Sequence, residues 1–139
     1  MSTFRTTLAG YTRYRGREGQ WMFILHRLTG LGTLLFLTIH ILDTATVYFI
    51  PSLYDDAIGL YRTTLFGIGE LALVFSVIFH GVNGLRLAFF DMFFPKNWTI
   101  PTERTSALWT LGISLVLFLP AAVIMLRNLL IHNFGLFGG

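Results

Sequence analysis

Long, uninterrupted runs of apolar residues dominate the chain and set its expected architecture. Three such runs occur, at about residues 21–50, 65–94 and 106–131. Pro51 and Pro95 end the first two runs, and Pro120 lies inside the third, where membrane helices tolerate a proline-induced kink. A helix needs roughly 20 apolar residues to cross a bilayer. The pattern therefore predicts an all-α integral membrane protein, a single membrane-anchor domain over 1–139 with three transmembrane helices.

The composition fits burial in lipid better than a water-soluble core. Of the 139 residues, 54% are hydrophobic and 12% are charged, and the mean hydropathy is +0.66. Soluble domains carry about 25% charged residues. The chain has no cysteine, which excludes disulfides, iron–sulfur ligation and thioether-linked haem. The polar N-terminal stretch does not have the pattern of a cleavable signal peptide.

Basic residues are distributed unevenly between the segments outside the apolar runs. Four arginines lie in the tail over residues 1–20, and Lys96 and Arg104 lie between the second and third runs. The opposite side carries Arg62 and Arg127. Because positively charged segments stay on the inner side, the tail is predicted to be cytoplasmic, or on the matrix side in an organelle. The tryptophans fall near the same interface, at Trp21, Trp98 and Trp109.

The apolar runs contain more ionisable residues than a passive anchor needs. These residues are His26, Arg27, His40, Asp43, Glu70, His80 and Arg86. Ionisable groups inside a membrane usually face the interior of a helical bundle. We therefore expect a second membrane subunit, or a bound cofactor, to cover them. The short basic tail fits membrane orientation better than nucleic-acid binding.

His80 is the first candidate for cofactor chemistry. It lies deep in the second run, about 21 Å from its inner end by helix rise, and shares a helical face with Ser76, Asn83 and Gly84. Gly84, one turn away, would leave room for a flat macrocycle. The alternative is a histidine hydrogen-bonded to a neighbouring helix, with Gly81 and Gly84 allowing close helix packing. Spacing alone does not choose between the two.

His26 and Arg27 lie about two turns inside the inner boundary of the first run. A guanidinium at this depth needs a partner, and a haem propionate or a quinone carbonyl would suit it. Taken alone, a side chain that snorkels back to the interface is the simpler interpretation of Arg27.

His40 points to nearly the same face as His26, closer to the outer surface. Asp43, one turn further, would orient the His40 ring; the alternative is an interfacial His–Asp pair.

Two segments resemble a known family. The stretch LHRLTG, from Leu25 to Gly30, resembles the H-R-x-[ST]-G signature of the cytochrome b subunit of succinate dehydrogenase. The stretch HGVNGLRLAFFD, from His80 to Asp91, resembles that subunit's second signature, H-x-x-x-G-x-R followed by an Asp. The order and spacing of the two signatures, the three-span layout and the inward N-terminus also agree. The resemblance covers the chain from about Tyr14 to Phe94, and the third run matches only as a hydrophobic helix.

The resemblance implies cofactors and partners. It makes His80 an axial ligand of haem b and places His26 and Arg27 near the haem propionates and the quinone pocket. Gly84 and Arg86 belong to the same expected cofactor-binding set. The implied partners are a flavoprotein, an iron–sulfur subunit and a second membrane anchor subunit, which together oxidise succinate and pass electrons to a quinone.

Two positions affect the expected quinone contact and the expected number of haems. Well-known members carry a quinone-contacting serine three residues before the signature histidine, where this chain has Phe23, so the quinone or its pose is expected to differ. Di-haem relatives carry a histidine thirteen residues after the signature arginine, and His40 occupies that place. The chain is therefore expected to bind one or two haems b, with two favoured. The rival functions are a haem-less structural anchor and a small proton- or solute-conducting subunit.

Overall fold

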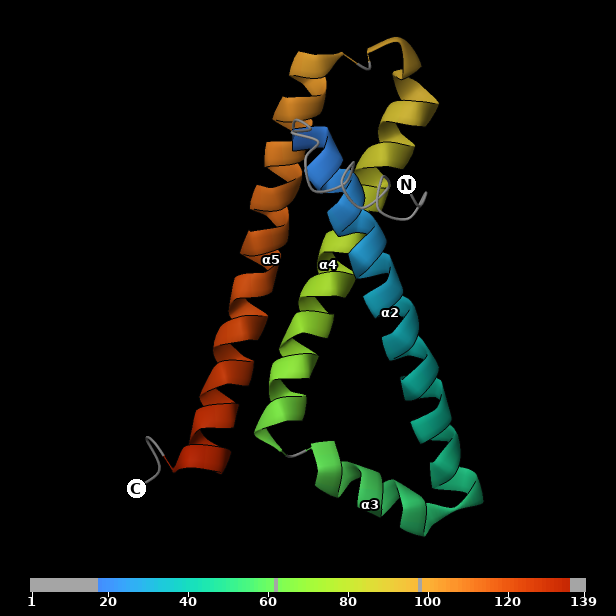
Figure 1. Cartoon of the computed structure of the whole chain (residues 1–139), viewed down its shortest axis with the longest axis vertical. Coiled ribbons are helices and arrows are strands. Elements are labelled where there is room, and N and C mark those ends of the chain that lie inside the picture. The colour runs from blue at the N-terminus through green and yellow to red at the C-terminus, as the bar shows by residue number, and fades with distance from the viewer. Residues whose placement is uncertain (1–17, 62, 98, 136–139) are drawn as a thin grey trace, which may run out of the picture.

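Three long helices and two short connecting helices make up the described part of the chain (Figure 1). The computed structural model describes residues 18–61, 63–97 and 99–135. Its elements in chain order are α2 (Glu18–Phe49), α3 (Pro51–Tyr61), α4 (Thr64–Phe93), the 3₁₀ helix η1 (Pro95–Asn97) and α5 (Ile100–Phe134). The helices α2, α4 and α5 are long and apolar enough to cross a membrane. The predicted all-α fold with three membrane-spanning helices is confirmed, and the chain is an integral membrane protein.

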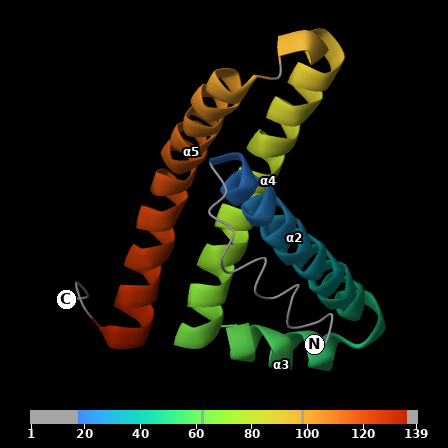
Figure 2. The same ribbon diagram turned by 45° about the horizontal axis from the view of Figure 1, so that its top comes forward.

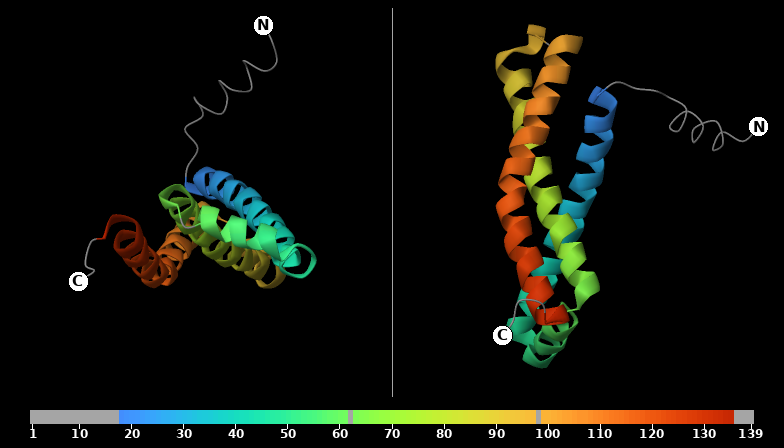
Figure 3. Two further views of the ribbon diagram at one scale, coloured as in Figure 1. Left: turned by 90° about the horizontal axis from the view of Figure 1, so that it is seen from below. Right: turned by 90° about the vertical axis from the view of Figure 1, so that its left-hand side faces the viewer.

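The middle helix in sequence is also the middle helix in space. α4 packs against both α2 and α5, whereas α2 and α5 contact each other less extensively. The right-hand view of Figure 3 shows the three long helices side by side, and Figure 2 shows α3 lying across one end. We call this the α3 end, and the opposite end, where η1 joins α4 to α5, the η1 end.

The connecting segments differ from the sequence-based boundaries. α5 begins at Ile100 rather than about residue 106, so Glu103 and Arg104 lie in its first turns and not in a linker. Pro101 suits this start because a proline in the first helical turn sacrifices no intrahelical hydrogen bond. The first connection is itself the helix α3. α5 continues through Pro120. The arginines of the N-terminal tail lie outside the described residues, as do Arg62 and Trp98.

A small core joins the three long helices towards the η1 end. Its apolar members are Met22, Phe79 and Ala107, one from each helix. Buried polar residues accompany them, namely Thr29, Asn83, Thr110 and Ser114. Thr29 and Thr110 donate hydrogen bonds to carbonyls of their own helices, at Leu25 and Ser106. Small hydroxyl residues allow the close helix approach that stabilises bundles in lipid, where burying apolar side chains brings little gain.

Candidate functional site

The structure brings the two predicted inner histidines into direct contact. The rings of His26 on α2 and His80 on α4 stack with centroids 4.1 Å apart and an interplanar angle of 6°. The Nδ1 atom of His80 lies 3.1 Å from the main-chain carbonyl oxygen of His26. A carbonyl only accepts, so this hydrogen bond requires Nδ1 to carry the proton. A neutral His80 in this tautomer keeps its Nε2 lone pair available.

Thr29 shares the carbonyl that anchors His80. Its hydroxyl lies 2.7 Å from the Leu25 oxygen and 3.1 Å from the His26 oxygen. Thr29 is buried. The first signature stretch therefore supplies the stacking ring, the anchoring carbonyl and a hydroxyl beside that carbonyl. Sequence reasoning did not identify Thr29 as a site residue, because a threonine that bonds its own helix leaves no periodic signal.

Gly84 lies on α4 beside the ring of His26. A Cβ atom built on it would lie 3.8 Å from Cε1 of His26, in ordinary van der Waals contact. Gly81, by contrast, has no atom within 4 Å of such a Cβ. A Cβ atom would therefore fit at Gly84, and its place in the expected cofactor-binding set stays a prediction.

The two arginines near His26 have different surroundings. Arg27 is exposed, and its guanidinium carbon lies 4.7 Å from the centroid of the Phe23 ring, within cation–π distance. Arg86 is partly buried and reaches Ser106 only at 3.5 Å. Two buried nitrogen atoms, Nε of Arg86 and Nδ1 of His26, have no hydrogen-bond partner among the described residues. Such orphaned groups are costly unless a ligand, water or partner satisfies them.

His40 lies at a second location, close to the α3 end. Its ring stacks on Phe36 with centroids 5.5 Å apart. It lines a cavity of about 440 Å³ between α2, α3 and α4, together with Asp43, Tyr61 and Glu70. Asp43 accepts a hydrogen bond from the Tyr61 hydroxyl on α3. The expected His40–Asp43 pair is thus replaced by a tyrosine that the sequence analysis had not considered.

The bond between Tyr61 and Asp43 affects the chemistry of the phenol. Hydrogen bonding to the Asp43 carboxylate raises the pKa of Tyr61 to about 12 from its ordinary value of 10.0, with smaller contributions from burial and from the charge of Glu70. Tyr61 therefore stays un-ionised at neutral pH. It ties the end of α3 to α2 beside His40.

The helix register separates the two histidine locations further than the sequence suggested. His80 packs beside Gly30 of α2, ten residues before His40, which is about 15 Å along the helix by its rise. From the sequence, helix rise predicts depths of about 21 Å for His80 and roughly 28 Å for His40, a difference of about 7 Å. The antiparallel register of α2 and α4 makes the difference, since it sets residue 80 level with residue 30.

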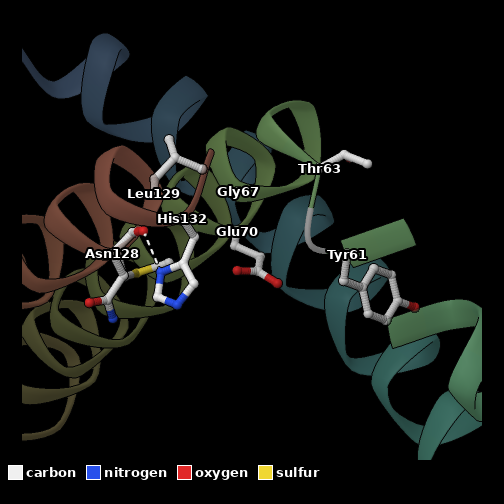
Figure 4. A pocket seen from close by; sticks show the side chains of 8 residues that line it. Tyr61, Thr63, Gly67, Glu70, Asn128, Leu129 and His132 are labelled. Carbon is white, nitrogen blue, oxygen red and sulfur yellow. Dashed lines mark hydrogen bonds between the residues drawn. The ribbon is translucent and has the colours of Figure 1, made fainter. Parts of the chain in front are cut away.

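A further cavity of about 630 Å³ lies at the α3 end between α4 and α5 (Figure 4). Its lining includes Tyr61, Glu70, Asn128 and His132. The Nδ1 atom of His132 lies 2.9 Å from the Asn128 carbonyl oxygen of its own helix, as the dashed line in Figure 4 shows. His132 is exposed and lies in the last turn of α5.

The comparisons with known proteins agree with the two signatures. A family model for the succinate dehydrogenase/fumarate reductase transmembrane subunit matches residues 4–121. The chain is also 34% identical over 131 residues to the succinate dehydrogenase 2 membrane subunit SdhC of Mycobacterium tuberculosis (strain ATCC 25618 / H37Rv). That match covers 90% of this chain and 93% of the relative. Fold, signatures and both comparisons together place the chain in the family of succinate dehydrogenase/fumarate reductase transmembrane subunits.

Proposed function

We propose that the chain is the haem b- and quinone-binding membrane anchor of a succinate:quinone oxidoreductase, carrying electrons from an iron–sulfur subunit to quinone. The observation that carries the proposal is the hydrogen bond from His80 Nδ1 to the His26 carbonyl. Metal-ligating histidines usually donate their other ring N–H in this way, which sets the tautomer and ring orientation.

The residues present fit a haem group. Among the described residues, no three His, Asp or Glu side chains gather to hold a metal ion by themselves. His80 would supply one axial nitrogen, and a second anchor subunit the opposite one. The unpartnered nitrogens of His26 and Arg86 suit a propionate carboxylate, which accepts hydrogen bonds. When bound, haem b supplies one-electron storage between the donor clusters and quinone.

The chain's own groups would then orient and hold the reactants. His26 keeps the His80 ring in one plane by stacking and by its carbonyl. Arg27 presents its charge at the bundle surface, where a partner subunit or a quinone carbonyl would meet it. His40 would ligate a second haem in the cavity of about 440 Å³. The proposed partners are the flavoprotein and iron–sulfur subunits on the side of the η1 end, together with the second anchor.

The optical spectrum of the purified complex tests the proposal. The wild-type complex should show the bands of low-spin haem b, and His80→Ala should lose or strongly shift one haem signal. His132→Ala is the matched control, because that ring is exposed and bonds its own helix. An unchanged spectrum in His80→Ala would remove the assignment. A colourless but fully assembled complex would favour a structural anchor, and ion conductance without haem would favour a conducting subunit.

A further inference from the structure

The ring of His80 occupies space that only a glycine leaves open on α2. A Cβ atom built on Gly30 would lie 2.8 Å from Cε1 and 3.1 Å from Nδ1 of His80. Ordinary contacts of Cβ begin near 3.4 Å, so an alanine would push the ring away by about 0.6 Å. The displaced atoms include Nδ1, which makes the bond to His26.

Gly30 and His26 hold the ring from neighbouring turns of one helix. They are four residues apart and therefore lie on the same face of α2. His26 contributes its stacked ring and its carbonyl, and Gly30, which has no side chain, leaves the space that the His80 ring fills. A shift of the ring away from Gly30 would lengthen or bend the Nδ1–H···O bond, whose present length of 3.1 Å leaves little margin within hydrogen-bond range.

We propose that Gly30 is a positioning residue that lets His80 lie against α2. In this position the Nδ1–H group of His80 donates its hydrogen bond to the His26 carbonyl, and Nε2 is left free as a ligand. This inference rests on the proposed haem-binding function for its spectroscopic consequences. A hydrogen-bonded Nδ1–H raises the basicity of a ligating imidazole, and hydrogen bonding around a haem ligand is one of the levers on its reduction potential. Gly30 thus acts on the haem through His80.

The test compares Gly30→Ala with two glycine controls in the purified complex. Gly59→Ala and Gly112→Ala add the same methyl group at positions away from His80 with no atom within 4 Å of the new Cβ. Gly30→Ala should shift the EPR g-values of the haem, raise its midpoint potential and weaken haem retention on the order of ten-fold. Both controls should match the wild type. A Gly30→Ala complex with wild-type spectrum and potential would overturn the proposal, as would equal shifts in the controls.

A second pair of measurements covers failure to assemble and absence of haem. If Gly30→Ala prevents assembly, the double variant Gly30→Ala/His80→Ala should restore it, because the clash partner is gone; failure to restore it means general packing and refutes the proposal. If the wild type contains no haem, the proposed function fails separately. The ring ¹⁵N shifts of His80 then decide: wild type should show a hydrogen-bonded Nδ1–H tautomer that Gly30→Ala disturbs, and identical shifts would refute the inference.

Discussion

The assembled complex is predicted to hold two haems b, one at the level of His80 and one at the level of His40. His40→Leu and His80→Ala are the perturbations. Each should remove one haem and leave the other, because the two rings lie in different parts of the bundle. His80 packs against His26 and Gly30, whereas His40 lines the cavity beside α3.

The separation of the two histidines gives the expected coupling. His80 lies level with Gly30, ten residues before His40, or about 15 Å at the rise of an α-helix. Two unit charges about 15 Å apart interact by about 1 kcal/mol at an effective dielectric constant of about 20. That energy corresponds to about 50 mV for one electron. Reduction of one centre should therefore lower the potential of the other by about this amount.

Haem quantified against covalent flavin is the first assay, and a redox titration of the haem bands is the second. The wild type should contain two haems per flavin, and His40→Leu one. The titration of the remaining haem should then lack the shift of about 50 mV. One haem per flavin in the wild type, with no change in His40→Leu, would refute the two-haem prediction. His132→Ala controls for the loss of an exposed histidine at the α3 end.

Three further predictions concern the surroundings of the site. Arg27→Leu should lower succinate:quinone activity about ten-fold, through a lost charge-assisted hydrogen bond, but not the reduction of a soluble dye by succinate; equal losses would mean failed assembly. The difference in tyrosinate absorbance between wild type and Tyr61→Phe should titrate near pH 12. Because the pKa of Tyr61 is raised in the folded chain, its stabilising bond is complete below about pH 10 and is lost as the pH approaches 12. In Asp43→Asn the midpoint should return towards 10, and an unmoved midpoint would contradict the assigned cause. Single cysteines at Lys96 and at Asp55 should be labelled from opposite sides of the membrane, with Lys96 on the side of the soluble subunits; labelling of both from one side would reverse that conclusion.

The approximate helix boundaries were predictable because they follow from local chemistry. Runs of apolar residues long enough to span a bilayer have few alternatives to a helix, since every backbone group must be satisfied inside the segment. The third apolar run starts at about residue 106, but the helix α5 begins at Ile100 and so includes the polar residues Glu103 and Arg104. A helix that protrudes beyond the lipid accepts such residues, and Arg104 pairs there with Glu18 of α2, its Nε lying 3.1 Å from the carboxylate.

The sequence by itself determined the three spans, the membrane environment and the candidate site residues, because residue type and helical period carry that information. Only the tertiary structure decided which of them meet. The antiparallel register of α2 and α4 stacks His26 on His80, seats that ring over Gly30, and sets His40 about 15 Å away by helix rise. The placement of α3 against α2 brings the Tyr61 hydroxyl, and not the His40 ring, into a hydrogen bond with Asp43. Contacts between helices depend on the register and rotation of the helices relative to one another. Small residues at the helix interfaces set both by allowing the backbones to approach closely. The sequence pattern of one helix alone does not contain this information.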